Sequence, residues 1–450
     1  MSRSATDRPL RFTVAHRSAV CNARLGCVET LHGSFDTPAF MPVGTRGSIK
    51  GIAPHMVAGI GAQIVLNNTY HLLLRPGPEL VARMGGVHRF MNWDGPILTD
   101  SGGYQAFSMA ESNTLDDDGV TFKSIVDGSK IRMTPERAIG VQNLLGADII
   151  MAFDDCPPSQ RAGLAVEGIG PAIDPRLTSA VKRDSGKKGY DHAARLEIAL
   201  ERTRKWLERC QAAHERPHEQ SLFGIVQGGT DLAMRTRSAS DITGVDLPGY
   251  AIGGVAVGES TDDIARVVAH TAPMLPADKP RYLMGVGYER DLLVAVRAGV
   301  DMFDCVLPTR NGRNANAFTS GGQIRLRNKQ FAEDAGPIEE GCDCPVCSPG
   351  TNGWRTPGGR AFSRGYLRHL FQAEEMLGPI LVSLHNLRHF QRFMADVRRT
   401  VCSGDWDGLL ARWPVAAPVV AAAVAEGEPE SGDAGLLGGE TVGDLPDLSA

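Results

Sequence analysis

The chain has 450 residues, 42% of them hydrophobic and 22% charged, with a formal net charge of −5, a composition typical of a globular protein with a sizeable core. It contains no run of about 18 apolar residues and no apolar signal region near residue 1, which argues against a membrane span and predicts a cytoplasmic protein. The net charge argues against a nucleic-acid partner, but its distribution does not. Seven acids and no Lys or Arg lie in 414–450, whereas 309–400 holds thirteen Lys and Arg against eight Asp and Glu. Such a basic third is compatible with a phosphate backbone or with an ordinary solvated surface.

Along the chain, short apolar runs end in polar or glycine residues, and a longer helix-compatible segment follows each run. Seven runs are legible, and an eighth, less legible one is expected near FMPVGT at 40–45. The seven lie at 62–68, 95–103, 147–155, 221–229, 249–259, 281–287 and 300–306. Continuous apolar runs are typical of strands buried on both faces, and strands alternating with helices imply a parallel sheet. The pattern predicts an α/β fold, a (β/α)8 TIM barrel, with a doubly wound open sheet as the alternative.

In a TIM barrel the active site lies at the C-terminal ends of the strands. The polar residues of these runs fall at those ends. They include Asn67, Asn68, Asp100, Asp154, Gln227, Gly254 and Asp304. Each one alone fits a helix cap or a turn residue. Their recurrence at the same place in successive units favours a functional site.

Two irregular stretches and the C-terminal end interrupt the pattern. Residues 159–192 and 348–360 are rich in Gly and Pro, so both are predicted to be inserted surface loops. Residues 414–450 are rich in Ala, Gly, Pro and acids and contain no aromatic residue, which predicts a disordered acidic tail. We therefore expect one catalytic barrel unit at 1–413, including a zinc-binding subdomain at about 314–400.

The zinc prediction rests on three of the nine cysteines, which lie together in CDCPVC at 342–347. Disulfides are rare in the cytoplasm, and three close thiolates fit part of a tetrahedral zinc site; free thiols are the alternative. The fourth ligand must come from elsewhere, and we favour His385 in SLHN over His369 and His389. Four protein ligands leave no position for water, so the predicted zinc is structural.

Two carboxylates at the strand ends point to the chemistry. Asp100 lies in TDSGG and Asp304 in FDCV. A pair of carboxylates at a barrel mouth suits glycosyl chemistry, in which one attacks the anomeric carbon and the other handles protons. The glycines of SGG at 101–103 could equally form a phosphate-binding turn. These residues alone predict a barrel hydrolase or transferase.

Other residues at the strand ends suit the recognition of a flat base. Asp154 can accept hydrogen bonds from N–H groups of a base edge, and the amide of Gln227 can donate to a carbonyl. Glycine at 253 and 254 would let a ring approach the backbone closely. Tyr104 offers an aromatic face.

Ten motifs, in order, resemble a known family. They are FMPVGTRGSIKG, LNNTYHLLLRPG, TDSGGYQAFS, FDDCPP, GIVQGG, GGVAVGE, RYLMGVG, FDCVLPTRNGRNA, CDCPVC and SLHN. Together they resemble bacterial tRNA-guanine transglycosylase, of the queuine tRNA-ribosyltransferase family, from about Phe12 to Arg399, without the two inserted segments and the tail. The resemblance implies a pentosyltransferase that exchanges the wobble guanine of GUN-anticodon tRNAs for 7-aminomethyl-7-deazaguanine (preQ1) in queuosine biosynthesis. It also implies double displacement through a covalent enzyme–RNA intermediate, one structural Zn²⁺ per subunit, and a homodimer.

The resemblance assigns roles to individual residues. It implies that Asp304 is the nucleophile that attacks C1′ of the ribose and that Asp100 is the general acid and base. The residues implied to bind the base are Asp100, Ser101, Gly102, Gly103, Tyr104, Asp154, Gln227, Gly254 and Met284, with Tyr104 and Met284 stacking on its two faces. The residues implied to form two RNA-contacting loops are Gly285, Val286, Gly287, Tyr288, Glu289, Arg290, Asp291, Thr309, Arg310, Asn311, Gly312 and Arg313. The implied zinc ligands are Cys342, Cys344, Cys347 and His385.

The incoming base and the competing functions stay open at this point. Cys156 and Val257 resemble the bacterial pattern, which favours 7-aminomethyl-7-deazaguanine over queuine or the archaeal 7-cyano base. Backbone carbonyls near 255–256 can accept from its ammonium group. A base-specific N-glycosidase that releases the base to water is the runner-up. A non-catalytic tRNA-binding partner would require loss of the acids, whereas Asp100 and Asp304 are both present.

Overall fold

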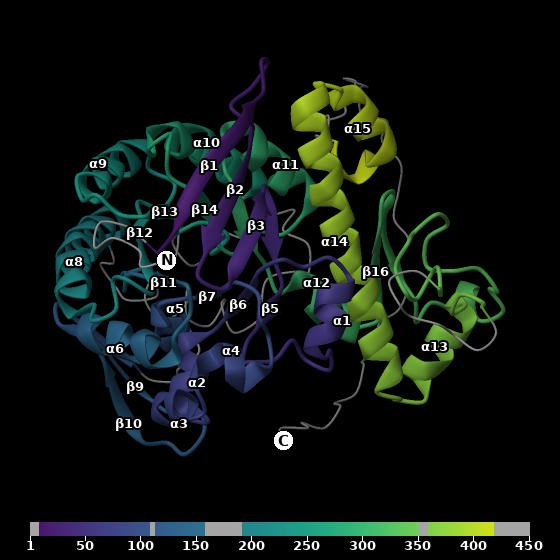
Figure 1. Cartoon of the computed structure of the whole chain (residues 1–450), viewed down its shortest axis with the longest axis horizontal. Helices are drawn as coiled ribbons and strands as arrows, with labels where there is room; N and C mark the ends of the chain where they lie inside the picture. Colours follow the sequence, from purple (N-terminus) through teal and green to yellow (C-terminus); the bar gives the residue numbers. More distant parts are fainter. Residues whose placement is uncertain (1–8, 109–112, 158–190, 351–358, 418–450) are drawn as a thin grey trace, which may run out of the picture. The chain divides into compact units, whose positions relative to one another are not determined.

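The computed structural model describes residues 9–108, 113–157, 191–350 and 359–417, and at its centre lies a parallel barrel (Figure 1). Nine short strands pair in the order β4-β15-β14-β13-β12-β11-β7-β6-β5, and all these pairs are parallel. Strands β4 (Ala39–Met41) and β5 (Val43–Gly44) are separated only by Pro42, so the two ends of the sheet belong to one stretch of chain and the ring closes. The other strands are β6 (Val65–Asn67), β7 (Ile97–Thr99), β11 (Ile149–Met151), β12 (Ser221–Val226), β13 (Gly249–Ile252), β14 (Arg281–Leu283) and β15 (Met302–Asp304). The predicted barrel, including the less legible strand near 40–45, is confirmed.

The apolar runs are continuous because both faces of the barrel strands are buried. One set of strand side chains fills the interior of the barrel; it includes Leu66, Leu98, Met151, Phe223, Tyr282 and Met302. The alternate set belongs to the larger core; it includes Val65, Ile97, Ile150, Leu222, Leu283 and Phe303. A strand with a helix layer outside and a packed interior has no face for polar side chains. Polar groups are therefore concentrated at the strand ends.

An unpredicted antiparallel sheet closes the N-terminal end of the barrel. Its strands are β1 (Arg11–Arg17), β2 (Arg24–Thr30) and β3 (Gly33–Thr37), which cross the barrel in Figure 1. Val28 and Phe35 pack with the interior side chains of the barrel. Arg24 donates to Asp301, which lies directly before β15, with an Nε–Oδ1 distance of 2.9 Å, and both side chains are buried. One end of the barrel is thus sealed, and a site is left to the other end.

Helices surround the barrel (Figure 1). They are α1 (Pro54–Gly59), α2 (Thr69–Leu74), α3 (Pro78–Arg83), α4 (Gly86–Met91), α5 (Gly103–Ser108), α6 (Pro135–Leu145), α8 (His192–Ala213), α9 (Leu232–Thr243), α10 (Thr261–Thr271), the 3-10 turn η1 (Ala272–Met274) and α11 (Glu289–Ala298). Capping side chains explain several of the starts. Asp191, Asp231 and Ser260 each accept a hydrogen bond from the backbone N–H three residues on. In the described ranges, no helix has the length and apolar character needed to cross a membrane.

A second unpredicted sheet lies between β7 and α6 in the chain. It contains β8 (Asn113–Asp116), β9 (Gly119–Lys123) and β10 (Lys130–Met133), paired antiparallel. Helix α8 packs beside it, where Trp206 donates from Nε1 to the carbonyl of Asp117 at 2.7 Å. The sheet belongs to the connection that follows β7, so it lies among the loops that extend a barrel at its C-terminal end.

The C-terminal third packs on the barrel through one long helix, α14, which runs beside it in Figure 1. The elements after β15 are α12 (Leu307–Arg313), β16 (Asn316–Thr319), β17 (Gly322–Arg325), η2 (Lys329–Phe331), α13 (Arg364–Gln372), α14 (Leu377–Ser403), α15 (Trp406–Arg412) and η3 (Pro414–Ala416). Asn386 of α14 accepts from the backbone N–H of Phe318 at 2.9 Å and donates to the carbonyl of Pro308 at 2.9 Å. One buried amide thus ties α12, the β16–β17 hairpin and α14 together.

Parts of the predicted segments lie outside the described residues. These are 159–190 of the inserted loop, 351–358 of the second insertion and 418–450 of the tail. Within the described part, Asp191 caps α8, and η3 joins the compact unit that ends at Ala417. The proposed division into a unit at 1–413 and a tail stays a prediction.

Two histidines share one buried carboxylate where the N-terminal sheet meets the barrel. His32, in the turn between β2 and β3, has its Nδ1 2.8 Å from Oδ1 of Asp148, and His88 of α4 has its Nε2 3.0 Å from Oδ2. The two imidazoles stack with centroids 3.6 Å apart. The hydrogen bond to Asp148 raises the pKa of His32; the bonds from both histidines hold the pKa of Asp148 below its ordinary value although burial opposes this.

These pKa shifts predict a pH-dependent contribution to stability. The His32 contribution is full below its unfolded pKa of about 6.5 and is lost as the pH rises through the raised folded pKa; the Asp148 contribution is lost only in acid. We expect Asp148→Asn to reduce the urea-derived free energy of unfolding more at pH 5.5 than at pH 8.5. His16→Gln, on exposed β1, is the control and should show no such difference. An equal loss for Asp148→Asn at both pH values would contradict the assignment.

Candidate active site and metal centre

Asp304 is the last residue of β15, and its carboxylate lies at the C-terminal mouth of the barrel. The hydroxyl of Tyr282 donates to its Oδ1 at 2.6 Å, and the backbone N–H of Gly285 donates to the same oxygen at 2.8 Å. Burial raises the pKa of Asp304, while these two bonds oppose the rise. Both bonds hold Oδ1, so neither engages Oδ2. The two bonds to one oxygen therefore orient the carboxylate at the mouth.

Asp100 directly follows β7 and is the second carboxylate of the mouth. Its Oδ1 accepts from the backbone N–H of Thr69 at 2.8 Å, and its Oδ2 accepts from the side-chain amides of Asn68 and, at 3.3 Å, Gln105. Burial raises the pKa of Asp100 to about 7, and the negative charge of Asp304 contributes to the rise. The structure thus brings together the two predicted carboxylates. A pKa near neutrality suits Asp100 to give and take a proton at physiological pH.

A second group of residues forms the side of the mouth beside Asp100. Nε2 of Gln227 donates to Oδ2 of Asp154 at 2.6 Å, and the hydroxyl of Ser101 donates to Oδ1 at 3.3 Å. Burial raises the pKa of Asp154 to about 6. Among the described residues, Oε1 of Gln227 is a buried oxygen without a hydrogen-bond donor. A ligand that carries N–H groups would satisfy such an acceptor.

Glycines allow these side chains to lie against the backbone. Gly254 has φ of +62°, and a Cβ atom there would clash with Oε1 of Gln227. Gly102 has φ of +73°, and a Cβ atom there would come within 2.9 Å of the backbone nitrogen of Tyr70. Gly103 starts α5 beside Phe153. Side chains at these positions would displace the residues that shape the mouth.

The two predicted stacking residues lie on different loops of the mouth. Tyr104 is in the first turn of α5, and Met284 directly follows β14 and packs on the interior cluster of the barrel. Both side chains keep part of their surface exposed. Stacking of a base between them stays a prediction.

The two predicted RNA-contacting segments are only partly exposed. The structure buries Val286, Gly287, Glu289, Asp291, Thr309 and Gly312, and leaves surface exposed on Gly285, Tyr288, Arg290, Arg310, Asn311 and Arg313. The prediction of a loop at 309–313 is wrong, because these residues belong to helix α12. The predicted loop at 285–291 is wrong in its last part, because α11 begins at Glu289. A proline suits the first turn of a helix, and Pro308 stands there. Gly312 lies so close to Ser383 of α14 that an added Cβ would meet its backbone at 2.7 Å, so packing favours the helix despite the Asn-Gly pair.

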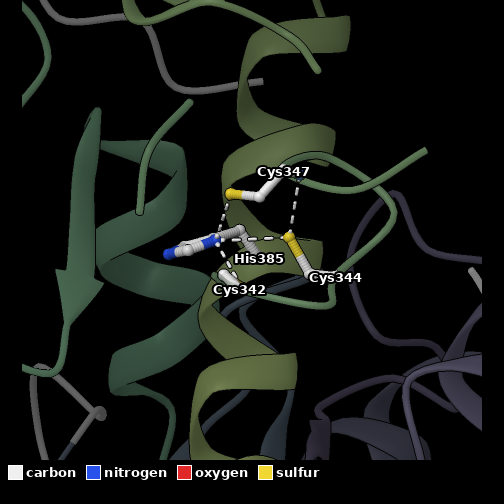
Figure 2. Close-up of side chains that lie close together, drawn as sticks. All are labelled: Cys342, Cys344, Cys347 and His385. Carbon is white, nitrogen blue, oxygen red and sulfur yellow. Dashed lines mark hydrogen bonds between the residues drawn. The ribbon is translucent and has the colours of Figure 1, made fainter. Parts of the chain in front are cut away.

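The predicted metal ligands form one buried cluster (Figure 2). Nδ1 of His385 lies 3.8 Å from Sγ of Cys342 and 3.4 Å from Sγ of both Cys344 and Cys347. Zinc bonds of about 2.3 Å to sulfur and 2.0 Å to nitrogen in a tetrahedron imply sulfur–nitrogen separations of about 3.5 Å. The four side chains therefore have the chemistry and spacing of a structural zinc site.

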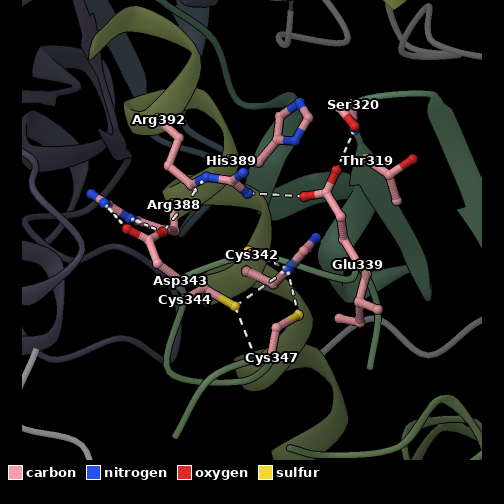
Figure 3. A network of polar contacts seen from close by, with 12 residues as sticks. Thr319, Ser320, Glu339, Cys342, Asp343, Cys344, Cys347, Arg388, His389 and Arg392 are labelled. Carbon is pink, nitrogen blue, oxygen red and sulfur yellow. Dashed lines mark hydrogen bonds and ion pairs between the residues drawn. The ribbon is translucent and has the colours of Figure 1, made fainter. Parts of the chain in front are cut away.

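Neighbouring contacts orient this cluster. Nε2 of His385 donates to the carbonyl of Phe318 at 2.7 Å, which leaves Nδ1 as the unprotonated nitrogen facing the three sulfurs. In Figure 3, Arg388 and Arg392 of α14 pair with Asp343 and Glu339 of the cysteine-bearing segment. The rival ligands lie elsewhere: His389 donates to Glu289 at 2.5 Å, and His369 is in α13.

Comparison with known proteins agrees with this geometry. The family model for queuine tRNA-ribosyltransferase matches residues 19–167 and 183–416. The chain belongs to the queuine tRNA-ribosyltransferase family. It is 46% identical over 411 residues to a queuine tRNA-ribosyltransferase of Synechococcus elongatus, covering 91% of this chain and 96% of the relative. It is 48% identical over 396 residues to one of Thermus thermophilus, covering 88% and 91%, and 46% identical over 408 residues to one of Symbiobacterium thermophilum, covering 90% and 92%.

The family match is wider than the motifs alone suggested. It continues through residues 348–360 and to residue 416, and it leaves residues 168–182 between its two matched parts. Of the segments treated as outside the resemblance, 348–360 and part of 159–192 therefore fall within the family. The match adds no role for them.

Several residues of this queuine tRNA-ribosyltransferase site were not predicted from the sequence, among them Gln105, which donates to Asp100. Tyr282 donates to Asp304, and Asn68, recognised only as a strand-end residue, donates to Asp100. The position of Tyr282 could have been predicted from the sequence. Alternate residues of a strand share a face, and Tyr282 lies two positions before Met284, which was predicted to be in the site. Nothing in the order of residues pairs positions 68 and 100. That contact depends on β6 and β7 being neighbours.

The Tyr282 bond gives a prediction about pH. Tyr282→Phe removes only the hydroxyl that stabilises the charged form of Asp304, so the pKa of Asp304 should rise further and the acid limb of the pH–rate profile should move to higher pH. We expect kcat at neutral pH to fall about tenfold, because a hydrogen bond to a charged group contributes about 1.5 kcal/mol or more. Tyr250→Phe, a buried tyrosine on the outer face of β13, is the matched control. An unchanged acid limb would refute the role of Tyr282.

Proposed function

We propose that this enzyme exchanges the wobble guanine of GUN-anticodon tRNAs for 7-aminomethyl-7-deazaguanine. The carrying observation is the pair of carboxylates at the strand ends of one barrel mouth, the buried Asp100 and the half-buried Asp304, together with membership of the queuine tRNA-ribosyltransferase family. An anticodon loop exposes its bases, so the guanine can leave its stack at small cost. We expect the enzyme in the cytoplasm, with its tRNA substrates.

The proposed reaction is a double displacement. Asp304 attacks C1′ of the ribose, the bond from C1′ to guanine N9 breaks, and Asp100 supplies the proton that guanine takes as it leaves. The 7-deazaguanine then gives its N9 proton to Asp100 and attacks C1′, which releases Asp304. One glycosidic bond replaces another, so no redox cofactor or nucleoside triphosphate is consumed. Two inversions retain the configuration at C1′.

The residues proposed to read the base are Ser101, Gly102, Gly103, Tyr104, Asp154, Gln227, Gly254 and Met284, with Asp100 beside them. The unpartnered Oε1 of Gln227 supports this assignment, because guanine and 7-deazaguanine carry N–H donors. With Nε2 of Gln227 donating to Asp154, the side chain presents an acceptor, where the sequence suggested a donor. When Asp154, whose pKa is about 6, carries a proton, it can donate that proton to Oε1 of Gln227. The amide of Gln227 would then rotate, and its NH2 group would face the base as a donor.

The aminomethyl group has a proposed acceptor in the loop after β13. Glu259 accepts from the backbone N–H groups of Ala256 and, at 3.0 Å, Val257. In a trans peptide the carbonyl points opposite to the N–H, so the carbonyl of Val255 points away from Glu259. This carbonyl is the proposed partner of the ammonium group.

We further propose that one Zn²⁺ is held by Cys342, Cys344, Cys347 and His385. The ion would fasten the cysteine segment to α14. It would supply no reacting group, because four protein ligands complete its coordination.

Arg310 and Arg313 of α12 are proposed to contact the anticodon backbone. Burial and the charge of Arg310 lower the pKa of Arg313, and a bound phosphate would relieve that repulsion. A homodimer, as the family resemblance implies, completes the proposal.

Base exchange tests the function directly. Labelled guanine should be incorporated into a tRNA whose anticodon begins G-U and should be chased out by 7-aminomethyl-7-deazaguanine, whereas a tRNA with A at the wobble position should incorporate none. Release of guanine without incorporation of a new base would establish the N-glycosidase instead. Binding of tRNA without either reaction would indicate a non-catalytic partner.

A further inference from the structure

Arg235 is a fully buried arginine that holds the backbone of two neighbouring loops of the base site. It lies in α9, is 0% exposed, and donates from Nε to the carbonyl of Gly229 at 2.8 Å. Its Nη1 donates to the carbonyls of Val226 at 3.0 Å and Gly253 at 2.7 Å, and its Nη2 donates to Gly254 at 2.9 Å. Val226 ends β12 and Gly229 follows it, whereas Gly253 and Gly254 follow the adjacent strand β13.

The hydrogen bonds from Arg235 fix the orientation of the peptide groups that follow Gly253 and Gly254. In a trans peptide, N–H and C=O point to opposite sides. Because Arg235 binds the carbonyls of Gly253 and Gly254, the N–H groups of Gly254 and Val255 point away from the guanidinium. Gln227 lies between the held carbonyls of Val226 and Gly229, and its side chain packs against Gly254. One side chain thus sets both the amide and the glycine backbone that are proposed to read the base.

The geometry points to Arg235 as a positioning residue for base recognition, an inference that rests on the proposed function and deepens it. A lysine cannot replace it, since a single ammonium cannot span four carbonyls on two loops, whereas the planar guanidinium offers five donors in a fixed fork. Arg235 need not touch the substrate. Its effect would reach the base through Gln227 and Gly254.

Arg281 provides a matched control at the opposite end of the barrel. It is 6% exposed and donates to the carbonyls of Leu275 at 2.6 Å and Gly299 at 3.3 Å. Burial lowers the pKa of each of the two arginines to about 10. Arg281→Lys therefore reproduces the loss of a buried, carbonyl-bound guanidinium without changing the mouth.

The test compares wild type, Arg235→Lys and Arg281→Lys in exchange of labelled guanine into tRNA. We expect Arg235→Lys to raise KM for guanine about 10- to 100-fold while KM for tRNA stays within about twofold, and Arg281→Lys to change neither. Both variants should lose thermal stability to a similar degree. Arg235→Gln repeats the test with an uncharged side chain.

Three outcomes would overturn the inference. One is a folded Arg235→Lys with an unchanged KM for guanine; another is an equal rise in Arg281→Lys. The third is failure of both Arg235 variants to fold while Arg281→Lys folds, which would make Arg235 a residue of general stability. Absence of guanine exchange in wild type would instead reject the proposed function, so the two failures are distinguishable.

Discussion

Asp304→Ala is expected to abolish the covalent protein–RNA adduct and to lower base exchange by at least about 10³-fold, as removal of a nucleophile does in other covalent enzymes. The substitution removes the carboxylate that Tyr282 and Gly285 orient at the mouth. Asp100, the proposed proton donor, remains, but it has no covalent intermediate to act on. Denaturing gel electrophoresis of enzyme incubated with labelled tRNA measures the adduct directly.

The control for this experiment is Asp304→Asn, which keeps the shape of the side chain and an oxygen that can accept from Tyr282. It should fold and bind tRNA as wild type does, and it should also form no adduct, because an amide is a poor nucleophile. Retention of adduct in either variant would remove Asp304 as nucleophile and would leave Asp100 as the remaining carboxylate to test.

Cys344→Ala should have the largest effect on stability. Sγ of Cys344 is buried 3.4 Å from Nδ1 of His385, so its loss opens the cluster and should reduce bound zinc from about one equivalent per chain to a small fraction. Zinc binding contributes about 10 kcal/mol or more in small zinc domains, so we expect a loss of several kcal/mol and early proteolysis within about 314–400. Metal analysis by mass spectrometry and limited proteolysis measure the two effects.

Cys402→Ala is the matched control, because Cys402 is an exposed free cysteine at the end of the same helix, α14. It should keep its zinc and its resistance to protease. Full zinc content in Cys344→Ala would mean that the metal, if bound, is held by other residues, and the proposed site would fail.

Much of the fold could be predicted because the barrel imposes a local pattern. Strands buried on both faces must be apolar throughout, and so polar residues collect where each strand ends. Asp100, Asp154, Gln227 and Asp304 could be selected from the sequence alone on this ground. The three cysteines could be selected because their ligand spacing lies within six residues, 342–347.

The failures lie where packing overrides local sequence. The Asn-Gly pair within 309–313 suggests a loop, but Pro308 and the close approach of Gly312 to Ser383 favour helix α12. The sheet β1–β3 was not predicted, because its strands contain no apolar run as long as those of the barrel strands. That the sheet closes the barrel is evident only from the structure, in which Val28 and Phe35 pack on the interior side chains of the barrel.

The sequence by itself determined the fold class, the family, and the chemical types present at the strand ends, because each is carried by residues close together in the chain. Only the tertiary structure decided which groups meet. Asn68 reaches Asp100, Tyr282 reaches Asp304, and Arg235 binds two loops, each because neighbouring barrel elements are brought within hydrogen-bond distance. Burial is a property of the packed structure and not of a single residue, and it raises the pKa of Asp100 to about 7. Sequence order specifies the groups, and packing specifies their partners and their protonation.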